Sequence, residues 1–371
     1  MLFQVIWIFN QIKEGSKYQT MVYLSFFQIV WIIVLVNFPT GTIGDKVNIG
    51  VSYPRFPPDV PSLPQEIVDL YKKYGIGKIR IPPIPDVLEA LRGSDIDVAL
   101  GIPNEDVETM ATNFDFATFW YTQFIEPYVH DVKFTFMIVG NEAIPGERGG
   151  FVSPAMRNLQ TVLDNNGVGS SIHVTTAVST NVLDFTLPPS AAEFTILALN
   201  EGLDKVVEFL QYVASNVLMV NVYPYNDYAA DPANIRLDFA QFTANEAVIV
   251  DDTLNYTNLF DATLDAFFWA LERANGSDVR LAVAETGWPT AGNGNVTTTA
   301  LASTYNNNLV KHVVNYNGTP KKPGQGGLDA FIFSLFDENT DPDEDRRNFG
   351  IFNSNLEPAY PLFSANGNKH F

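Results

Sequence analysis

Cysteine is absent from this sequence of 371 residues, and histidine is scarce. Without cysteine the chain forms no disulfide and no thiolate metal site, and it has no cysteine nucleophile. The four histidines are scattered along the chain and show none of the spacings typical of metal ligands. The sequence therefore predicts no metal site and no cofactor.

Basic residues are also few, with 22 Lys and Arg against 42 Asp and Glu, a formal net charge of −20. A nucleic-acid binder needs clustered Lys and Arg for phosphate contacts, and an anionic membrane surface attracts the same residues. The balance argues against both partners. A neutral polymer such as a polysaccharide is compatible with it, although solubility alone accounts for such a charge.

The amino-terminal region contains a strongly apolar run, Tyr23 to Phe38, followed by small and turn-prone residues from Pro39 to Gly44. The run is shorter than the about 20 apolar residues of a membrane-spanning helix and is typical of a signal peptide. We expect residues 1–44 to be an extension plus signal peptide, with Met21 as an alternative start. An uncleaved signal anchor is the competing interpretation. Residues 45–371 then form the mature domain.

Acceptor sequences for N-glycosylation begin at four asparagines in the second half of the chain: Asn255, Asn275, Asn295 and Asn317. Together with the signal-like start, they favour a secreted glycoprotein of the extracellular space or cell wall, with vacuolar delivery as the alternative. We expect no stable membrane insertion once the signal is removed.

After residue 46 the sequence alternates short apolar, β-branched runs with helix-like stretches. Strands are predicted at 47–53, 76–81, 97–102, 134–140, 173–178, 218–225, 280–285 and 331–336. Helices are predicted at 64–74, 86–92, 115–129, 154–165, 202–215, 258–274 and 299–316. Strands that are apolar on both faces and alternate with helices indicate a parallel sheet covered by helices. Eight such units, with no glycine-rich phosphate loop after the first strand, predict a single-domain (β/α)8 TIM barrel of the α/β class.

Two acidic residues directly follow predicted strands. Glu142 comes after the fourth strand, and Glu285 ends the seventh. The active site of such a barrel lies at the carboxyl ends of its strands. Retaining glycosidases need one protonated and one ionised carboxyl about 5 Å apart. Alone, each glutamate could equally be a structural cap or an ion-pair partner; as a pair, they favour glycoside hydrolysis.

Three motifs make this interpretation specific: Gly140-Asn141-Glu142, Glu285-Thr286-Gly287-Trp288-Pro289 and Phe336-Asp337-Glu338-Asn339. They resemble the plant-type glucan endo-1,3-β-glucosidases of glycoside hydrolase family 17, and the likeness runs from Asn48 to about Phe363. The resemblance implies that Glu142 is the general acid/base and Glu285 the nucleophile, that Asn141 binds the sugar 2-hydroxyl, and that Glu338 supports the cleft. Asn104 lies in a further matching stretch, Gly101-Ile102-Pro103-Asn104, and is expected to bind substrate.

Aromatic residues at the predicted strand ends could stack on the apolar faces of sugar rings. We expect Tyr53, Tyr223 and Trp288 to bind substrate in this way. Phe336 and Tyr225 fit a sugar contact and core packing equally well, and Phe336 is retained among the substrate-binding candidates.

The sequence departs from the family around the cleft. Asp341 replaces a usual lysine, and Arg346 replaces a usual glutamate. Pro54 and Pro82 also differ, and the pair Asn226-Asp227 stands where an aromatic and a small residue are frequent. Exchanging a cation for Asp341 could raise the pKa of the nearby carboxylates, so we expect an altered pH dependence or substrate preference.

The predicted activity is retaining endo-hydrolysis of β-1,3-linkages in β-glucan by a monomeric enzyme that needs no cofactor. Two alternatives keep the enzyme class: hydrolysis of mixed β-1,3-1,4-glucan, and transfer onto another glucan chain. A third is a non-catalytic glucan-binding protein of the cell wall. A barrel without a sugar ligand is disfavoured by the aromatic residues at the strand ends.

Overall fold

The computed structural model describes residues 49–54, 63–213, 216–338 and 346–364. The predicted signal peptide (1–44), residues 47 and 48 of the first predicted strand, and Asp341 lie outside the described residues.

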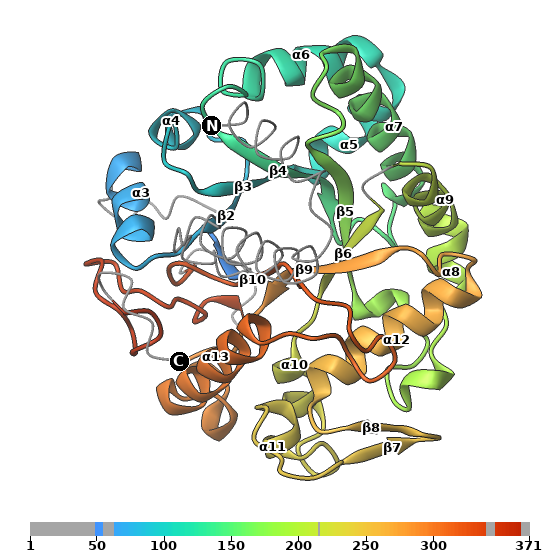
Figure 1. The fold of residues 1–371 in the computed structure, drawn as a ribbon, viewed down its shortest axis with the longest axis vertical. Coiled ribbons are helices and arrows are strands. Elements are labelled where there is room, and N and C mark those ends of the chain that lie inside the picture. Colours follow the sequence, from blue (N-terminus) through green and yellow to red (C-terminus); the bar gives the residue numbers. More distant parts are fainter. Residues whose placement is uncertain (1–48, 55–62, 214–215, 339–345, 365–371) are drawn as a thin grey trace, which may run out of the picture. The chain divides into compact units, whose positions relative to one another are not determined.

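Eight parallel strands close into a barrel, each paired with the next along the chain and the last with the first (Figure 1). In order around the barrel they are β1 (Ile49–Ser52), β2 (Lys78–Ile81), β3 (Asp97–Ile102), β4 (Lys133–Asn141), β5 (His173–Ser179), β6 (Val217–Asn221), β9 (Arg280–Thr286) and β10 (Ala330–Ile332). The predicted (β/α)8 barrel is confirmed. Each of its strands overlaps a predicted one.

Helices surround the barrel in Figure 1. They are α3 (Pro64–Lys73), α4 (Pro85–Ala90), α5 (Asn104–Thr112), α6 (Phe114–Phe124), α7 (Gly149–Asn165), α8 (Ile196–Ala198), α9 (Asp204–Tyr212), α10 (Pro224–Ala230), α11 (Leu237–Ala240), α12 (Leu259–Arg273) and α13 (Thr299–Val314). Short helical turns follow β5 at η2 (Thr180–Val182), η3 (Pro189–Ala191) and η4 (Leu199–Leu203), and follow β9 at η5 (Gly294–Val296).

Prolines explain two differences from the predicted elements. The sixth strand was expected to reach Tyr225, but it ends at Asn221 because Pro224 begins α10. The helix expected over 115–129 ends at Phe124, three residues before Pro127. Proline has no N–H to donate within a strand or a helix interior, and its fixed φ suits the first turn of a helix.

The core has two separate clusters that follow the alternation of side chains along the strands. The residues of one cluster are small or apolar and alternate with residues of the other, as Ala99 does with Val98 and Ile138 with Met137. Because successive side chains on a strand point to opposite faces, the smaller cluster fills the inside of the barrel and the larger one packs against the helices. Both faces of the strands are buried, as their apolar runs predicted.

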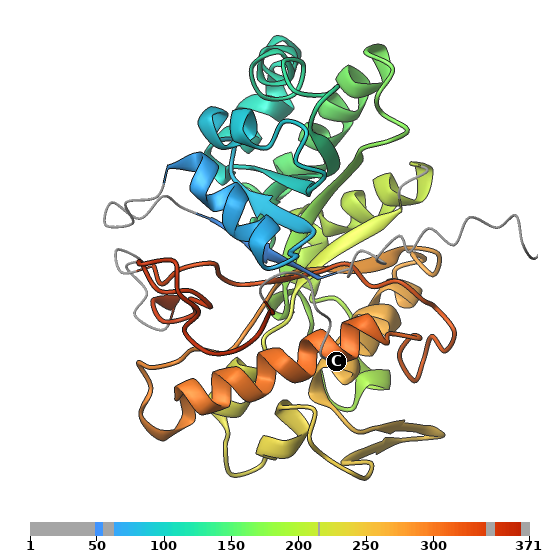
Figure 2. The ribbon, with the colours of Figure 1, turned by 60° about the vertical axis from the view of Figure 1, so that its left-hand side comes forward.

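A two-stranded antiparallel hairpin, which the sequence did not predict, lies at the edge of the barrel between α11 and α12 (Figures 1 and 2). Its strands are β7 (Ile249–Asp251) and β8 (Leu254–Tyr256). The Tyr256 hydroxyl donates a hydrogen bond to Asp265 of α12, with 2.9 Å between Oη and Oδ2. This buried bond ties the hairpin to the barrel's outer layer.

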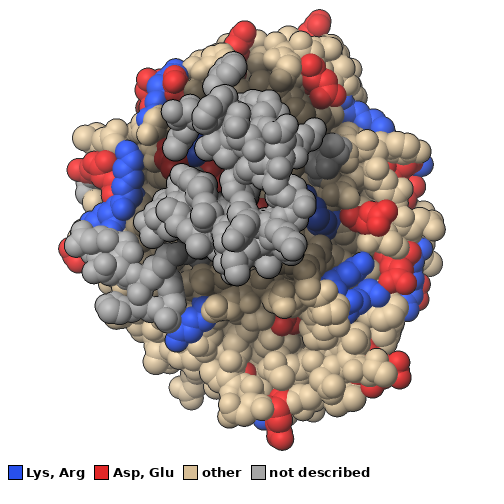
Figure 3. All heavy atoms as spheres, in the orientation of Figure 1, with Lys and Arg blue, Asp and Glu red and all other residues tan. Residues whose placement is uncertain are grey.

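The charged side chains are spread over the face seen in Figure 3, and several Lys and Arg lie beside Asp and Glu around its edge. Among the ion pairs of the described residues, Arg92 lies 2.7 Å from Asp131 and Lys205 lies 3.0 Å from Glu208. In the described part of the chain, no helix combines the length and apolar character needed to cross a membrane.

Candidate active site

A cleft lies at the carboxyl ends of the barrel strands and has two adjoining halves that share Phe333 and Arg346. The first, called here the Glu285 half, has a volume of about 550 Å³ and is lined by Pro54, Arg80, Ile81, Pro82, Gly101, Ile102, Pro103, Asn104, Glu105, Asn141, Glu285, Phe333, Glu338 and Arg346. The second, the Glu142 half, has a volume of about 530 Å³. It contains Glu142 together with residues of the loops that follow β5, β6 and β9.

The backbone at the end of β4 positions Glu142. Gly140 has a φ of 72° and Glu142 a φ of 54°, so both lie in the left-handed region that most side chains avoid. A Cβ at Gly140 would stand 3.0 Å from the Asn104 side-chain oxygen, which explains the glycine there. The pairing between β4 and β5 shifts register before Asn141, and the Glu142 N–H donates to the Ala177 carbonyl at 2.8 Å. Together these features turn Glu142 into the cleft.

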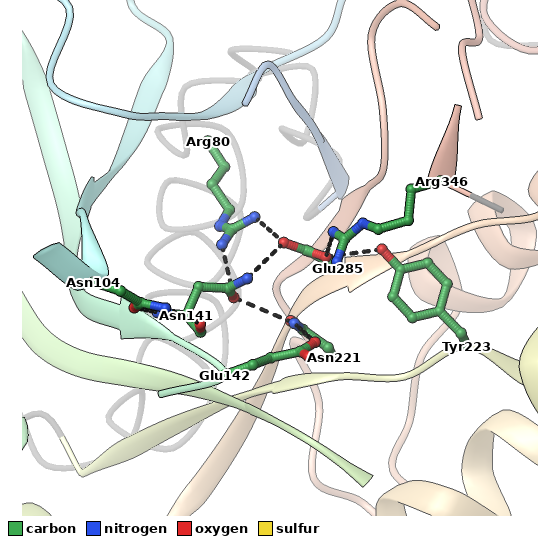
Figure 4. A network of polar contacts seen from close by, with 8 residues as sticks. All are labelled: Arg80, Asn104, Asn141, Glu142, Asn221, Tyr223, Glu285 and Arg346. Atoms are coloured by element: carbon green, nitrogen blue, oxygen red, sulfur yellow. Dashed lines mark hydrogen bonds and ion pairs between the residues drawn. The ribbon is translucent and has the colours of Figure 1, made fainter. Parts of the chain in front are cut away.

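Glu285 lies at the end of β9, is only 2% exposed, and is held at both carboxylate oxygens (Figure 4). Arg80 and Asn141 donate to Oε1, with donor–acceptor distances of 2.7 and 3.2 Å. Tyr223 and Arg346 donate to Oε2 at 2.9 and 3.1 Å. Burial by itself would raise the pKa of Glu285, but Arg80 and Arg346, with the hydrogen bonds of Arg80 and Tyr223, lower it below its ordinary value. This carboxyl is therefore ionised.

Glu142 is in the opposite electrostatic environment. Burial is the main cause that raises the pKa of its carboxyl, and the nearby negative charge of Glu285 adds to the increase. A hydrogen bond from the Asn221 amide, 2.6 Å from Nδ2 to Oε1, and the charges of Arg346 and Arg80 offset only part of this. The two carboxyls thus differ in the direction of their pKa shifts, as an acid and a nucleophile require.

Two asparagines connect the carboxyls. The Asn221 amide donates to Glu142 and, at 3.2 Å, to the Asn141 side-chain oxygen. Asn141 also accepts from Arg80 at 3.0 Å and donates to Glu285. Asn104 fixes the Asn141 backbone through a reciprocal pair of hydrogen bonds, at 2.8 and 2.9 Å. The network orients both carboxyls before any substrate is present.

The structure brings four of the predicted substrate-binding residues to the cleft. Asn104, Asn141 and Glu338 line the Glu285 half, and Tyr223 lines the Glu142 half. Burial raises the pKa of Tyr223 well above its ordinary value, so its hydroxyl keeps its proton and donates to Glu285. Tyr225 also reaches the Glu142 half and accepts a hydrogen bond from Asn293 at 3.3 Å.

The structure does not bring the other three predicted residues to the described cleft lining. Trp288 has no exposed surface; its indole N–H donates to the Val296 carbonyl, and its ring packs against Tyr225, Tyr228 and Tyr305. Tyr53 and Phe336 are 1% and 4% exposed and contact each other edge to face. Aromatic character at a strand end fits packing as well as stacking, and here packing is what is observed.

Three residues of the network were not predicted as site residues: Arg80, Asn221 and Arg346. Arg80 is the residue before the last in β2, and Asn221 is the last residue of β6. The strand-end rule that selected the glutamates could therefore have found both. Arg346 follows the last strand, β10, by 14 residues in the sequence, and the only signal it gave was its departure from the family's usual glutamate. Among the described residues, no group of three His, Asp or Glu is placed to hold a metal ion.

Comparison with known proteins connects this geometry to one family. The sequence profile of Glycosyl hydrolases family 17 matches residues 49–363. The chain is 42% identical over 344 residues to the probable glucan endo-1,3-beta-glucosidase BG4 of Arabidopsis thaliana, covering 92% of this chain and 98% of that one. It is 37% identical over 337 residues to a glucan endo-1,3-beta-glucosidase of Nicotiana tabacum, a basic vacuolar isoform, with 88% of each chain covered.

A solved structure extends the likeness to three dimensions. The pollen protein CJP38 of Cryptomeria japonica, described as a beta-1,3-glucanase and allergen, superposes with a TM-score of 0.80 at 39% identity. The match covers 86% of this chain and 99% of that one.

Proposed function

This chain belongs to glycosyl hydrolases family 17, and we propose that it hydrolyses internal β-1,3-glucosidic linkages of β-glucan with retention of configuration. One observation carries the proposal. Two carboxyls share a cleft; two guanidinium groups keep one of them ionised, and burial raises the pKa of the other. The named activity of the relatives supports the β-1,3 linkage.

The proposed reaction has two displacement steps. In the first, a Glu285 oxygen attacks the anomeric carbon while the bond to the leaving oxygen breaks, and Glu142 gives its proton to that oxygen. In the second, the Glu142 carboxylate takes a proton from water, and the water oxygen displaces Glu285 from the anomeric carbon. The products are two shorter glucans, and Glu142 ends with its proton restored.

The network gives each of the other residues a part in this scheme. Arg80, Arg346 and Tyr223 hold Glu285 ionised and oriented by donating to both of its oxygens. Asn141 is placed beside Glu285, where a sugar 2-hydroxyl would lie during attack. Asn221 fixes the orientation of the Glu142 carboxyl.

Hydrolysis of laminarin and of mixed-link β-1,3-1,4-glucan by the wild type, Glu142→Ala and Glu285→Ala tests the proposal. We expect laminarin to be the better substrate, and Glu142→Ala to lower its hydrolysis about 100- to 10,000-fold, since that is the usual contribution of a general acid. Glu285→Ala should lose more, because no covalent intermediate can form. Glu108→Ala removes an exposed carboxylate of α5 outside the cleft and should leave the rate unchanged.

Added azide separates the two roles. In Glu142→Ala, azide attacks the covalent intermediate and should give a β-glycosyl azide, whereas in Glu285→Ala it replaces the nucleophile and should give the α-product. Rescue in the reverse pattern would contradict the assignment. A wild type that binds glucans without cleaving either substrate would support a non-catalytic binding protein instead.

We further propose that the chain follows the secretory route. The apolar run before Pro39 supports this, and so do the exposed positions of Asn255, Asn275 and Asn295. The tobacco relative is named as a vacuolar isoform, so delivery outside the cell and to the vacuole are both consistent with the route. Enzymatic removal of N-glycans from the chain expressed in plant cells should reduce its mass; an unchanged mass would argue against the proposal.

A monomer is the proposed state in solution. The exposed large apolar side chains of the described surface are spread over several elements, with Phe114 and Phe119 on α6, Ile196 and Leu197 on α8, and Val250 on β7. No single element therefore carries enough exposed apolar side chains to form an extended interface between subunits. Light scattering coupled to size exclusion should give the mass of one chain.

A further inference from the structure

The wall of the Glu142 half contains polar residues that the proposed reaction does not use. It is built by the loops that follow β5, β6 and β9. Its polar members outside the catalytic network are Ser179, Thr180, Asn181, Asn226, Asp227 and Asn293. Asp227 is the one ionisable side chain among these six.

Asp227 lies in α10, four residues after Tyr223, and lines the cleft beside Asn226. Within the part of the chain that the structure describes, its carboxylate forms no hydrogen bond or ion pair. Burial alone raises its pKa to about 6, which agrees with a carboxyl shielded from water and without a neighbouring cation. A partly buried carboxylate normally accepts a hydrogen bond or pairs with a cation. The exposed side of the Asp227 carboxylate faces the cleft.

The chemistry of the reaction assigns the two halves of the cleft to the two parts of the substrate. The nucleophile must reach the anomeric carbon of the sugar that forms the covalent intermediate, so this sugar lies over Glu285. The acid must reach the oxygen that leaves, so the departing sugar lies toward Glu142. Asp227 shares the Glu142 half and is absent from the lining of the other half.

We propose that Asp227 is a specificity-determining residue that accepts hydrogen bonds from hydroxyl groups of the glucosyl units on the leaving side of the scissile bond. This inference rests on the proposed function. A carboxylate has two oxygens and can accept from two neighbouring hydroxyls, and such charge-assisted bonds are stronger than neutral ones. Asn226 and Asn293 supply amide groups in the same wall, which suits a sugar with hydroxyls rather than an apolar leaving group.

Two substrates that differ only in the leaving group test the proposal. Laminaripentaose releases a sugar, whereas a nitrophenyl β-laminaritrioside releases nitrophenol, which has no sugar hydroxyls. For Asp227→Ala we expect kcat/KM on laminaripentaose to fall about 10- to 100-fold, the range for losing a hydrogen bond to a charged group, with nitrophenol release nearly unchanged. Asp227→Asn keeps the shape and one acceptor oxygen and should fall between Asp227→Ala and the wild type.

Asp231→Asn is the matched control, because it removes an exposed carboxylate at the end of the same helix and outside the cleft lining. It should leave both rates at their wild-type values. Equal losses of Asp227→Ala on both substrates, or no loss on either, would overturn the inference while leaving the hydrolase intact. A wild type that cleaves neither substrate would instead remove the proposed function, and the inference with it.

Discussion

At the scale of single residues, Arg346 connects the two halves of the cleft. Its guanidinium group donates to Glu285 and lies over the Phe333 ring, 5.0 Å from the ring centroid. The charge of Arg346 lowers the pKa of both proposed catalytic carboxyls, Glu142 and Glu285. The expected influence of Asp341 has the opposite sign and stays a prediction, since that residue lies outside the described part of the chain.

We predict that Arg346→Gln shifts the whole pH–rate profile to higher pH. Glu285 acts ionised, and loss of the Arg346 charge raises its pKa. The acid limb of the kcat/KM profile therefore moves to higher pH, and activity at low pH is lost. Glu142 acts protonated, and its pKa also rises without Arg346, so the alkaline limb of the profile moves to higher pH as well. The measurement is kcat/KM on laminarin from about pH 3 to 9.

Arg236→Gln provides the comparison, because Arg236 is exposed, pairs with Asp238 at the start of α11 and lies outside the cleft lining. Its profile should match that of the wild type. A profile for Arg346→Gln that loses height without moving would mean that the guanidinium group orients Glu285 but does not set the pKa of either carboxyl.

At the scale of secondary-structure elements, Trp288 joins three of them. It follows β9 and packs against Tyr225 and Tyr228 of α10 and Tyr305 of α13. Tyr305 in turn shares a 2.6 Å hydrogen bond with Thr286, the last residue of β9. This cluster supports the first turn of α10, which carries Tyr225 into the Glu142 half.

Trp288→Ala should therefore act mainly on stability. We expect it to lower the free energy of unfolding by about 3–5 kcal/mol, the usual cost of truncating a buried Trp or Phe, as measured by denaturant titration. Trp288→Phe should lose less, because it keeps most of the packed ring. A raised KM for laminarin with unchanged stability would instead restore the sugar-stacking role expected from the sequence.

The amino terminus of α13 offers a smaller, local prediction. The Thr298 side chain caps this helix by accepting a hydrogen bond from the Leu301 N–H, at 3.2 Å. Thr298→Ala leaves that N–H without its protein partner and should lower the free energy of unfolding by about 1 kcal/mol. Thr298→Ser retains the cap and should stay within a few tenths of the wild-type value in the same titration. Equal losses for both variants would show that the methyl group, and not the cap, contributes the stability.

At the scale of the whole molecule, the net charge of −20 acts on any charged substrate before it reaches the cleft. Repulsion between a negatively charged protein and an anionic polymer slows their association, and dissolved salt screens it over about 10 Å at 0.1 M. We predict that carboxymethylated β-1,3-glucan is cleaved more slowly than neutral laminarin at low salt. Raising the salt to about 0.5 M should reduce the difference between the two cleavage rates, while the rate on laminarin changes little. The same salt response for both substrates would contradict this.

The sequence by itself determined the barrel and the place of its two glutamates. Eight apolar runs alternating with helical stretches leave few other ways to bury both faces of the strands. Because the carboxyl ends of parallel strands meet at one side of a barrel, Glu142 and Glu285 could be assigned to one site without coordinates. The β7–β8 hairpin escaped prediction because its strands are three residues each and too short to show a period.

The tertiary structure alone decided which side chains contact the two carboxyls. Arg80 and Glu285 are 205 residues apart in the chain, and Asn221 and Glu142 are 79 apart, so no local pattern relates them. The burial of Trp288 was decided in the same way, by helices α10 and α13 that close over it. A pKa depends on the burial and charges around a group, and these come from distant parts of the chain. Residue type and strand order therefore sufficed to locate the glutamates, whereas the opposite shifts of their pKa values required the folded barrel.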